Sequence, residues 1–185
     1  MKKLTLVLFA LLVVSATHAQ TKKINLKKSV ITWTGKKVTG EHSGTINYKE
    51  GTLLFEKKRL IGGTFIADMT TLTNTDQTGK DKAKLEGHLK SADFFNTEEY
   101  KTAKLVFKTI KAKKTDLYAI TADLTIKGKT NPVKFDLLFK ARTATSSFSI
   151  DRTKYGIQYG SGSFFDDLGD RTIYDEFDLN VKIVY

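Results

Sequence analysis

The chain has no cysteine among its 185 residues and only one proline. Without cysteine, thiol catalysis, thiolate metal ligands and disulfide bonds are excluded, so the fold must be stabilised by burial of side chains. The sequence also lacks a Gly-x-Ser-x-Gly nucleophile elbow and a His-Glu-x-x-His zinc motif. The acidic residues between positions 166 and 176 do not have the spacing of a calcium loop. We therefore predict that the protein is not an enzyme and holds no metal or cofactor.

Long hydrophobic runs are absent too, apart from one at the N-terminus. Two lysines precede the apolar segment Leu4–Val14, and Thr17 and Ala19 stand where signal peptidase prefers small residues. The segment is shorter than the roughly 20 apolar residues that a membrane-spanning helix needs. We expect a cleaved signal peptide over residues 1–19 and one domain over residues 20–185, which is periplasmic or secreted. An uncleaved membrane anchor is the alternative.

Acidic residues are fewer than basic ones, which gives a formal net charge of +11. Such a surplus can indicate a nucleic acid, a membrane surface or an acidic ligand as partner. Here the lysines occur in pairs at predicted turns and strand ends, as at Lys27/Lys28 and Lys57/Lys58, and aromatic residues are not interleaved with them to stack on bases. We expect a solvated surface that protects strand edges and allows transient contact with a membrane surface, but no nucleic-acid partner.

Alternation of apolar and polar residues dominates the rest of the sequence. It is strongest in Ala103–Lys111, Val133–Ala141 and Phe177–Tyr185, as in half-buried antiparallel strands, whose successive side chains point to opposite faces. The weaker candidates for strands are Val30–Thr34, Ser43–Tyr48, Thr52–Glu56, Leu60–Met69, Leu117–Ile126 and Ser147–Ile150.

Turn residues separate these strands, and one segment interrupts them. Lys49–Gly51, Lys127–Lys129 and Asn131–Pro132 have the composition of turns. The alternation stops from Thr70 to Tyr100, and within this segment Asp81–Lys90 contains helix formers with apolar residues spaced toward one face. The sequence therefore predicts an all-β fold with a short helical excursion, either a closed antiparallel barrel or a sandwich. An eight-stranded barrel would have an interior just large enough to be filled by side chains or to hold one small ligand.

Three motifs carry a resemblance to a known family. The first is His88–Phe95, which reads His-Leu-Lys-Ser-Ala-Asp-Phe-Phe and is followed by Tyr100. The second is Ala122–Val133, with the sequence Ala-Asp-Leu-Thr-Ile-Lys-Gly-Lys-Thr-Asn-Pro-Val, and the third is Ile150–Ile157. Together they resemble the YceI-like family of exported lipid-binding proteins, in order along the whole predicted domain. The sequence departs from the family's pattern at Lys101, where a proline is common, and in the polar, Gly-rich stretch of residues 158–175.

The resemblance implies a single eight-stranded, lipocalin-like antiparallel barrel whose interior holds a polyisoprenoid or a related long apolar molecule. The expected ligand is thus a polyisoprenoid, an isoprenoid quinone or a fatty-acid derivative, bound without catalysis for carriage or storage in the cell envelope. The alternative is a solid barrel, a structural or interaction protein that docks on anionic envelope surfaces through its basic face. A homodimer is compatible with either reading.

The candidate site residues follow from the alternation and from the resemblance. Arg152 is a candidate for contact with a ligand headgroup or, equally, for an ion pair at the barrel seam. His88 is a candidate for holding the helix over the barrel mouth. The aromatic and leucine residues expected on inner faces either fill the core or line a cavity. They are Trp33, Phe55, Phe65, Phe94, Phe95, Phe107, Leu124, Phe135, Leu137, Phe139, Phe148 and Phe177.

Overall fold

The computed structural model describes residues 19–185, so the predicted signal peptide lies outside the described residues except for Ala19. The strands are β1 (Gln20–Lys23), β2 (Val30–Lys37), β3 (Gly40–Glu56), β4 (Arg59–Asn74), β5 (Thr102–Ala112), β6 (Leu117–Ile126), β7 (Lys129–Lys140), β8 (Thr143–Asp151) and β9 (Ile173–Val184). The helices are α1 (Gly79–Lys90) and two short 3₁₀ helices, η1 (Arg152–Tyr155) and η2 (Gly169–Arg171).

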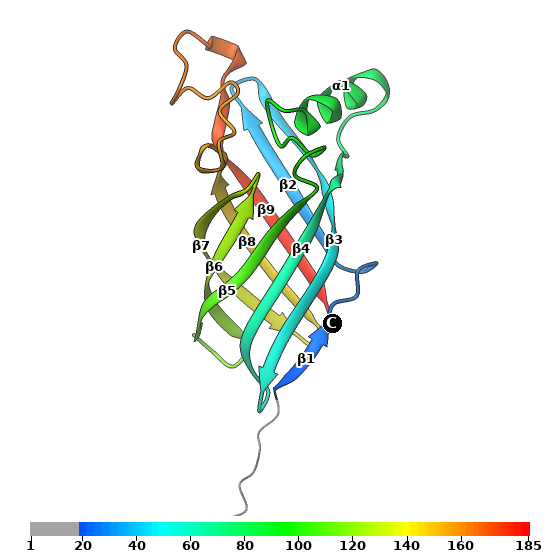
Figure 1. Ribbon diagram of the computed structural model, residues 1–185, viewed down its shortest axis with the longest axis vertical. Helices are drawn as coiled ribbons and strands as arrows, with labels where there is room; N and C mark the ends of the chain where they lie inside the picture. Colours follow the sequence, from blue (N-terminus) through cyan, green and yellow to red (C-terminus); the bar gives the residue numbers. More distant parts are fainter. Residues whose placement is uncertain (1–18) are drawn as a thin grey trace, which may run out of the picture.

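The strands close into one antiparallel barrel (Figure 1). Its order is β2-β9-β8-β7-β6-β5-β4-β3, and β3 pairs with both β2 and β4, which completes the ring. The short β1 pairs with residues 52–55 of β3, on the same edge that carries β2 along residues 40–46. Strands β1 and β2 thus share one position, and the predicted eight-stranded barrel is confirmed. The ring leaves no room for the two separate sheets of a sandwich.

The predicted break at Lys49–Gly51 is wrong. The structure has one continuous strand, β3, where the sequence predicted two strands, Ser43–Tyr48 and Thr52–Glu56. The pairing of β3 with β4 instead shifts register between Tyr48 and Glu50. A β-bulge accommodates the extra residue and bends the strand without ending it.

The predicted turn at Asn131–Pro132 is also wrong, because both residues lie in β7. The reversal occurs just before them, at Lys127 and Gly128, whose φ angles of 50° and 72° fit a two-residue hairpin turn. Pro132 faces Asp123 near the beginning of β7, where a missing N–H is tolerated. The turn predicted at Lys127–Lys129 is confirmed.

Side chains of one parity along each strand point inward. In β6 the buried residues are Tyr118, Ile120, Ala122, Leu124 and Ile126, and the residues between them are partly exposed. The buried residues of the whole barrel form two clusters. The alternation in the sequence therefore correctly identified the inner face of the sheet.

The helix and the longest connection lie at the same end of the barrel, the upper end in Figure 1. Helix α1 stands in the connection between β4 and β5, and the segment from Gly156 to Thr172 connects β8 to β9. The helix predicted over Asp81–Lys90 is confirmed and begins slightly earlier, at Gly79. Among residues 19–185, no helix combines the length and the apolar character that crossing a membrane requires.

Candidate functional site

The barrel encloses an apolar cavity of about 800 Å³, a volume that includes the part open to solvent. Its lining is apolar except for Lys104, Ser146 and the hydroxyl of Tyr48. The Ser146 hydroxyl donates to the carbonyl oxygen of Asp136 at 2.7 Å, so this polar group is satisfied within the protein. Burial raises the pKa of Tyr48, which keeps the phenol neutral. The interior therefore suits an uncharged, apolar molecule.

A belt of aromatic rings runs around this inner cavity. Neighbouring ring centroids are 6.0 Å apart for Tyr48 and Phe65, and 5.6 Å apart for Phe65 and Phe107. The belt continues from Phe107 to Phe135 at 6.1 Å and from Phe135 to Phe148 at 4.6 Å, where the rings stack. Ring contacts of this kind hold their members in defined orientations. The belt therefore gives the cavity a preformed wall.

The inner cavity includes many of the predicted site residues and others that the prediction missed. The missed ones are mostly aliphatic, such as Ile46, Met69 and Leu179. They occupy inward positions of alternating strands, so the period-two pattern could have found them if it had been applied to aliphatic residues as well as rings. The predicted residues that line the cavity are Phe65, Phe95, Phe107, Leu124, Phe135, Leu137, Phe148 and Phe177.

Two predicted residues, Phe55 and Phe139, are not part of the inner cavity's lining and instead close the lower end of the barrel. Their ring centroids are 5.9 Å apart, and both rings lie 5.8 Å from the ring of Tyr185. Phe139 also contacts Tyr118 at 5.6 Å. Phe55 and Phe139 stand next to the β3–β4 and β7–β8 turns, respectively. These four rings, the aromatic plug, make this end blind.

At the other end the cavity adjoins a vestibule of about 1520 Å³, again including space open to solvent. The predicted residues Trp33, His88, Phe94 and Arg152 line it, together with residues of β2, α1 and the β8–β9 connection. Helix α1 and that connection are the elements seen at the upper end of Figure 1. The vestibule is more polar than the inner cavity, because lysines, an aspartate and two histidines contribute to its wall.

A constriction separates the two spaces. Ile46, Phe95 and Phe177 line both of them, and the rings of Phe95 and Phe177 meet edge to face with centroids 6.3 Å apart. The backbone N–H of Phe95 donates to the Leu89 carbonyl oxygen at 3.1 Å, which ties the ring's position to the end of α1. The Lys127 ammonium donates to two further carbonyl oxygens of this segment, each at 2.9 Å. The constriction thus combines a ring from the segment between α1 and β5, Phe95, with side chains from β3 and β9.

The vestibule contains polar atoms that have no partner within the protein. Among residues 19–185 the buried atoms without a hydrogen bond are Nε1 of Trp33, Oε1 of Gln77, Nε2 of His88 and the Tyr155 hydroxyl. The first three belong to residues that line the vestibule. Buried polar groups are nearly always satisfied in folded proteins. Their concentration at one place identifies the vestibule as the polar part of the site.

His88 lies between two aromatic rings. Its centroid is 4.4 Å from that of Tyr159 and 5.5 Å from that of Phe94, both edge to face. The Tyr159 side chain is itself half-exposed, so this ring is the cover that separates the imidazole from solvent. The contacts join α1 to the β8–β9 connection across the mouth, which agrees with the role predicted for His88.

Arg152 is one of the most buried residues of the barrel, at 2% exposure. Burial lowers the pKa of its guanidinium, and the nearby Asp175 and Asp151 oppose this shift. Each of its five N–H groups has an acceptor in the protein, so none remains for a ligand headgroup. The acceptors are the carbonyl oxygens of Ile157 (2.8 Å), Tyr159 (2.9 Å), Ile173 (2.9 Å) and Tyr174 (3.1 Å) and the carboxylate of Asp175 (3.5 Å). The guanidinium thus links the β8–β9 connection to β9 through four carbonyl oxygens and an ion pair with Asp175.

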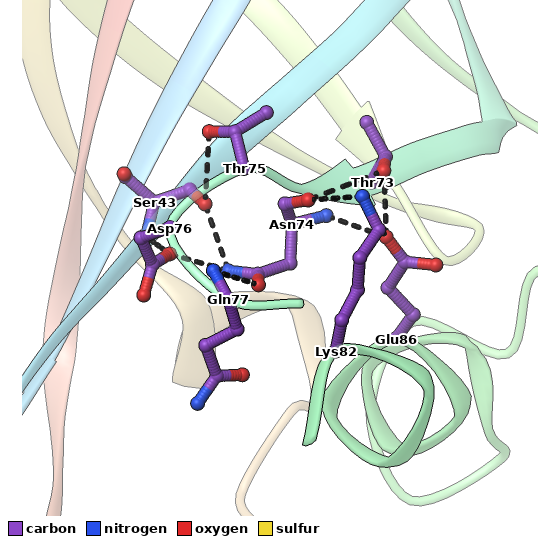
Figure 2. Close-up of polar contacts among 8 residues, drawn as sticks. All are labelled: Ser43, Thr73, Asn74, Thr75, Asp76, Gln77, Lys82 and Glu86. Atoms are coloured by element: carbon purple, nitrogen blue, oxygen red, sulfur yellow. Dashed lines mark hydrogen bonds and ion pairs between the residues drawn. The ribbon is translucent and has the colours of Figure 1, made fainter. Parts of the chain in front are cut away.

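A second polar network holds α1 against the end of β4 (Figure 2). The Glu86 carboxylate accepts from the Thr73 hydroxyl at 2.6 Å and from the Asn74 backbone N–H at 2.8 Å. The Lys82 ammonium donates to the Asn74 carbonyl oxygen at 2.7 Å. The hydrogen bonds from Thr73 and Asn74 hold the pKa of Glu86 below its usual value. Charge-assisted hydrogen bonds therefore attach the helix, in addition to the packing of Leu85 and Leu89 in the core.

Asn74, which is fully buried, extends this network toward β3 (Figure 2). Its side chain donates to the Ser43 carbonyl oxygen at 2.9 Å and to the Asp76 carboxylate, which also accepts from the Ser43 N–H at 2.7 Å. Asp76 lies 2.8 Å from Nδ1 of His42. Burial alone would raise the pKa of Asp76, but the hydrogen bonds from His42, Ser43 and Asn74 hold it below its usual value.

Metal binding has no geometric support in the described part of the chain, since no three histidine, aspartate or glutamate side chains gather there. His42 is paired with Asp76, and His88 is enclosed by aromatic rings. The geometry is instead that of a lipocalin-like barrel: a closed antiparallel barrel with a blind apolar cavity and a polar vestibule at its one mouth.

The chain belongs to the YceI-like family, whose domain model matches residues 23–185. Among curated relatives, Protein YceI of Escherichia coli O157:H7 is 36% identical over 94 residues, which cover 50% of this chain and 46% of that protein. A protein of Pectobacterium atrosepticum, UPF0312 protein ECA1782, is 35% identical over 94 residues with the same coverage. The matched segment thus spans about half the length of each curated relative. The resemblance that the three motifs predicted is confirmed.

Solved structures with low sequence identity share the fold. BcnA of Burkholderia cenocepacia superposes with a TM-score of 0.68 at 19% identity, covering 88% of this chain and 99% of BcnA. A polyisoprenoid-binding domain from Saccharophagus degradans, implicated in plant cell wall breakdown, gives a TM-score of 0.59 at 13% identity, covering 87% and 95% of the two chains. The YceI protein of Campylobacter jejuni gives 0.55 at 14% identity, with coverage of 100% and 98%.

Proposed function

We propose that the protein binds one long apolar molecule with a polar end and carries or stores it in the cell envelope without catalysis. The apolar chain would occupy the inner cavity, and the polar end would occupy the vestibule. The observation that carries the proposal is the continuity of a blind, apolar cavity with a vestibule that contains unpartnered polar atoms. A polyisoprenoid, an isoprenoid quinone and a fatty-acid derivative all have this two-part shape.

Binding would be driven by burial of the apolar chain. Removing apolar surface from water contributes about 25 cal/mol per Å², and immobilising a flexible ligand offsets part of this gain. The aromatic belt reduces the protein's share of that loss, because its rings already contact one another in fixed orientations. A preformed wall therefore favours binding of a flexible chain more than a collapsed interior would.

The vestibule favours an uncharged polar end with an oxygen acceptor. The Nε1–H of Trp33 is a donor, and the amide of Gln77 can accept or, when rotated, donate. The buried cation of the site, Arg152, has its N–H groups engaged by the protein. A carbonyl or hydroxyl oxygen, as in a quinone or a prenyl alcohol, matches these groups better than a carboxylate does.

The comparisons support this proposal at the level of the barrel. The Saccharophagus degradans domain that shares the fold is a polyisoprenoid-binding domain. The cavity and the alternating inner faces are features of this chain's own residues, and they suit the same class of molecule.

The proposal is tested by mass spectrometry of an organic extract from natively purified protein. We expect a stoichiometric species with a prenyl or acyl chain. A Phe135→Asp variant, which places a charge in the aromatic belt, should lose this species. Leu138→Asp is the matched control, because Leu138 lies in the same strand with its side chain exposed, and it should retain the ligand. A folded wild-type protein that stays empty after incubation with envelope lipids would contradict the proposal.

A further inference from the structure

Large apolar side chains are exposed at the mouth of the barrel. Exposed large apolar residues are informative when they gather in one patch rather than when they are scattered singly. The five that gather here are each between 49% and 51% exposed. They are Val38, Tyr159, Phe164, Phe165 and Tyr174, and we call this set the mouth rim.

Hydrogen bonds bring the segments of the mouth rim together. The backbone N–H of Val38, in the β2–β3 turn, donates to the Thr172 carbonyl oxygen at 3.1 Å. The N–H of Ile173 donates to the Gly160 carbonyl oxygen at 2.8 Å, which draws the two ends of the β8–β9 connection together. The N–H groups of both phenylalanines of the rim donate to the Ser161 carbonyl oxygen, at 3.1 and 3.0 Å. The rim is therefore one surface, although its residues come from distant parts of the sequence.

The mouth rim borders the opening of the site and is held rigidly. Tyr159 and Tyr174 line the vestibule as well as being half-exposed. The carbonyl oxygens of the same two tyrosines accept hydrogen bonds from buried Arg152 at 2.9 and 3.1 Å. Ser161, which anchors Phe164 and Phe165, is fully buried. A buried framework thus holds these apolar side chains outward, where they contribute little hydrophobic free energy to the stability of the fold.

The charges around the mouth rim are balanced, although the whole chain has a net charge of +11. A balanced rim does not fit a polyanion, and it does not require an anionic lipid. Half-exposed aromatic and aliphatic side chains with an even mixture of charges suit the interface of a neutral bilayer, where aromatic rings gather at the level of the headgroups. The exposed charged residues of the vestibule wall and of residues 156–172 are Lys36, Lys37, Lys84 and Arg171 on one side and Asp81, Asp166, Asp167 and Asp170 on the other.

We infer that the mouth rim docks on a lipid bilayer, with the Phe164–Phe165 loop and Val38 entering the interface. Docking in this orientation places the vestibule opening against the membrane. An apolar molecule can then pass between the bilayer and the barrel without crossing bulk water. The inference extends the proposed function, but docking itself needs no bound ligand, so the two can fail separately.

The test is flotation of the protein with phosphatidylcholine vesicles at low and high salt. The wild type should bind at both, because apolar insertion is little affected by ionic screening. The double variant Phe164→Ser/Phe165→Ser should have an affinity for the vesicles that is lower by about tenfold or more, since two large apolar side chains no longer enter the interface. The matched control is Ile61→Ser/Leu138→Ser, which removes two side chains of 46% and 43% exposure from outside the rim, and it should bind like the wild type.

Several results would overturn the inference. One is a rim variant that binds as tightly as the control. Others are a wild type that binds no neutral vesicles, or one whose binding requires anionic lipid and disappears in high salt, which would indicate the basic surface instead. Self-association of the wild type that Phe164→Ser/Phe165→Ser abolishes would show that a second copy covers this face. Ligand content measured on the same variants remains a separate readout, so an empty but vesicle-binding protein would refute only the proposed function.

A second variant tests the orientation on the membrane by a measurement that does not depend on a loss of binding. Phe164→Trp places a fluorophore at the proposed insertion point, and the natural tryptophan, Trp33, is buried. With vesicles of brominated phosphatidylcholine we expect strong quenching of the new tryptophan. Ile61→Trp, outside the rim, should show none. Equal quenching at both positions would contradict the proposed orientation.

Discussion

The two ends of the barrel are built on different principles. At the lower end, four aromatic rings pack against one another and close the cavity. At the upper end, α1 and the β8–β9 connection are held by hydrogen bonds to buried polar groups, chiefly Arg152 and Asn74. Apolar packing is non-directional and excludes water, whereas a polar framework can hold loops apart around an opening. The difference explains how one small barrel is sealed at one end and accessible at the other.

The largest effect should come from breaking the polar framework. We expect Arg152→Met to lower the free energy of unfolding by about 3–5 kcal/mol, because four carbonyl oxygens and the Asp175 carboxylate lose their donor. Urea unfolding measures this. Lys154→Met, at an exposed neighbouring position, is the control and should change stability by less than about 0.5 kcal/mol. A change below about 1 kcal/mol for Arg152→Met would show that packing also holds the upper end.

A smaller effect should separate the plug from the constriction. Phe139→Ala should destabilise the fold by about 2–4 kcal/mol, because it leaves a cavity among Phe55, Tyr118 and Tyr185. Phe95→Ala should lower the free energy of unfolding by only about half as much, since the ring of Phe95 faces the inner cavity on one side and the vestibule on the other. Release of a bound fluorescent lipid should accelerate in Phe95→Ala and not in Phe139→Ala. The reverse order of release rates would mean that the ligand leaves through the lower end.

The smallest effect should be the response of α1 to acid. The folded-state pKa values of Glu86 and Asp76 lie below their ordinary values of 4.5 and 3.8. Each carboxylate therefore adds stability that is complete above the ordinary value and is lost as the pH falls through the folded-state value. The loss of attachment free energy should be on the order of 1 kcal/mol after solvent screening. We expect acrylamide quenching of Trp33, which shares the vestibule with α1, to increase below about pH 4.5 as a result. In Glu86→Gln the quenching should be raised already at neutral pH and depend less on acid. If Glu86→Gln had the same pH dependence of quenching as the wild type, contacts other than those of Glu86 would hold α1.

The sequence predicted the face of each strand better than the position along the barrel. Alternation placed Phe55, Phe135 and Phe139 on the inner face, and the structure agrees. It could not distinguish the belt, where Phe135 lies, from the plug, where the other two lie, because residue parity carries no information about height along the axis. That height depends on register and on bulges such as the one between Tyr48 and Glu50.

The upper end was the least predictable part, for a related reason. The partners of Arg152 are backbone carbonyl oxygens, which have no signature in the side-chain sequence. The contact of His88 with Tyr159 joins residues far apart in the chain. The motif that contains His88 was recognisable from the family, but the ring that covers it lies in the Gly-rich stretch where this chain departs from the family's pattern.

The aromatic plug has a kinetic consequence for the proposed carrier. A tube with a single opening allows no incoming molecule to push the resident one out from behind. Release must precede loading, so exchange should follow a strictly dissociative order. Its rate should be set by departure of the bound molecule and should not rise with the concentration of the one that replaces it.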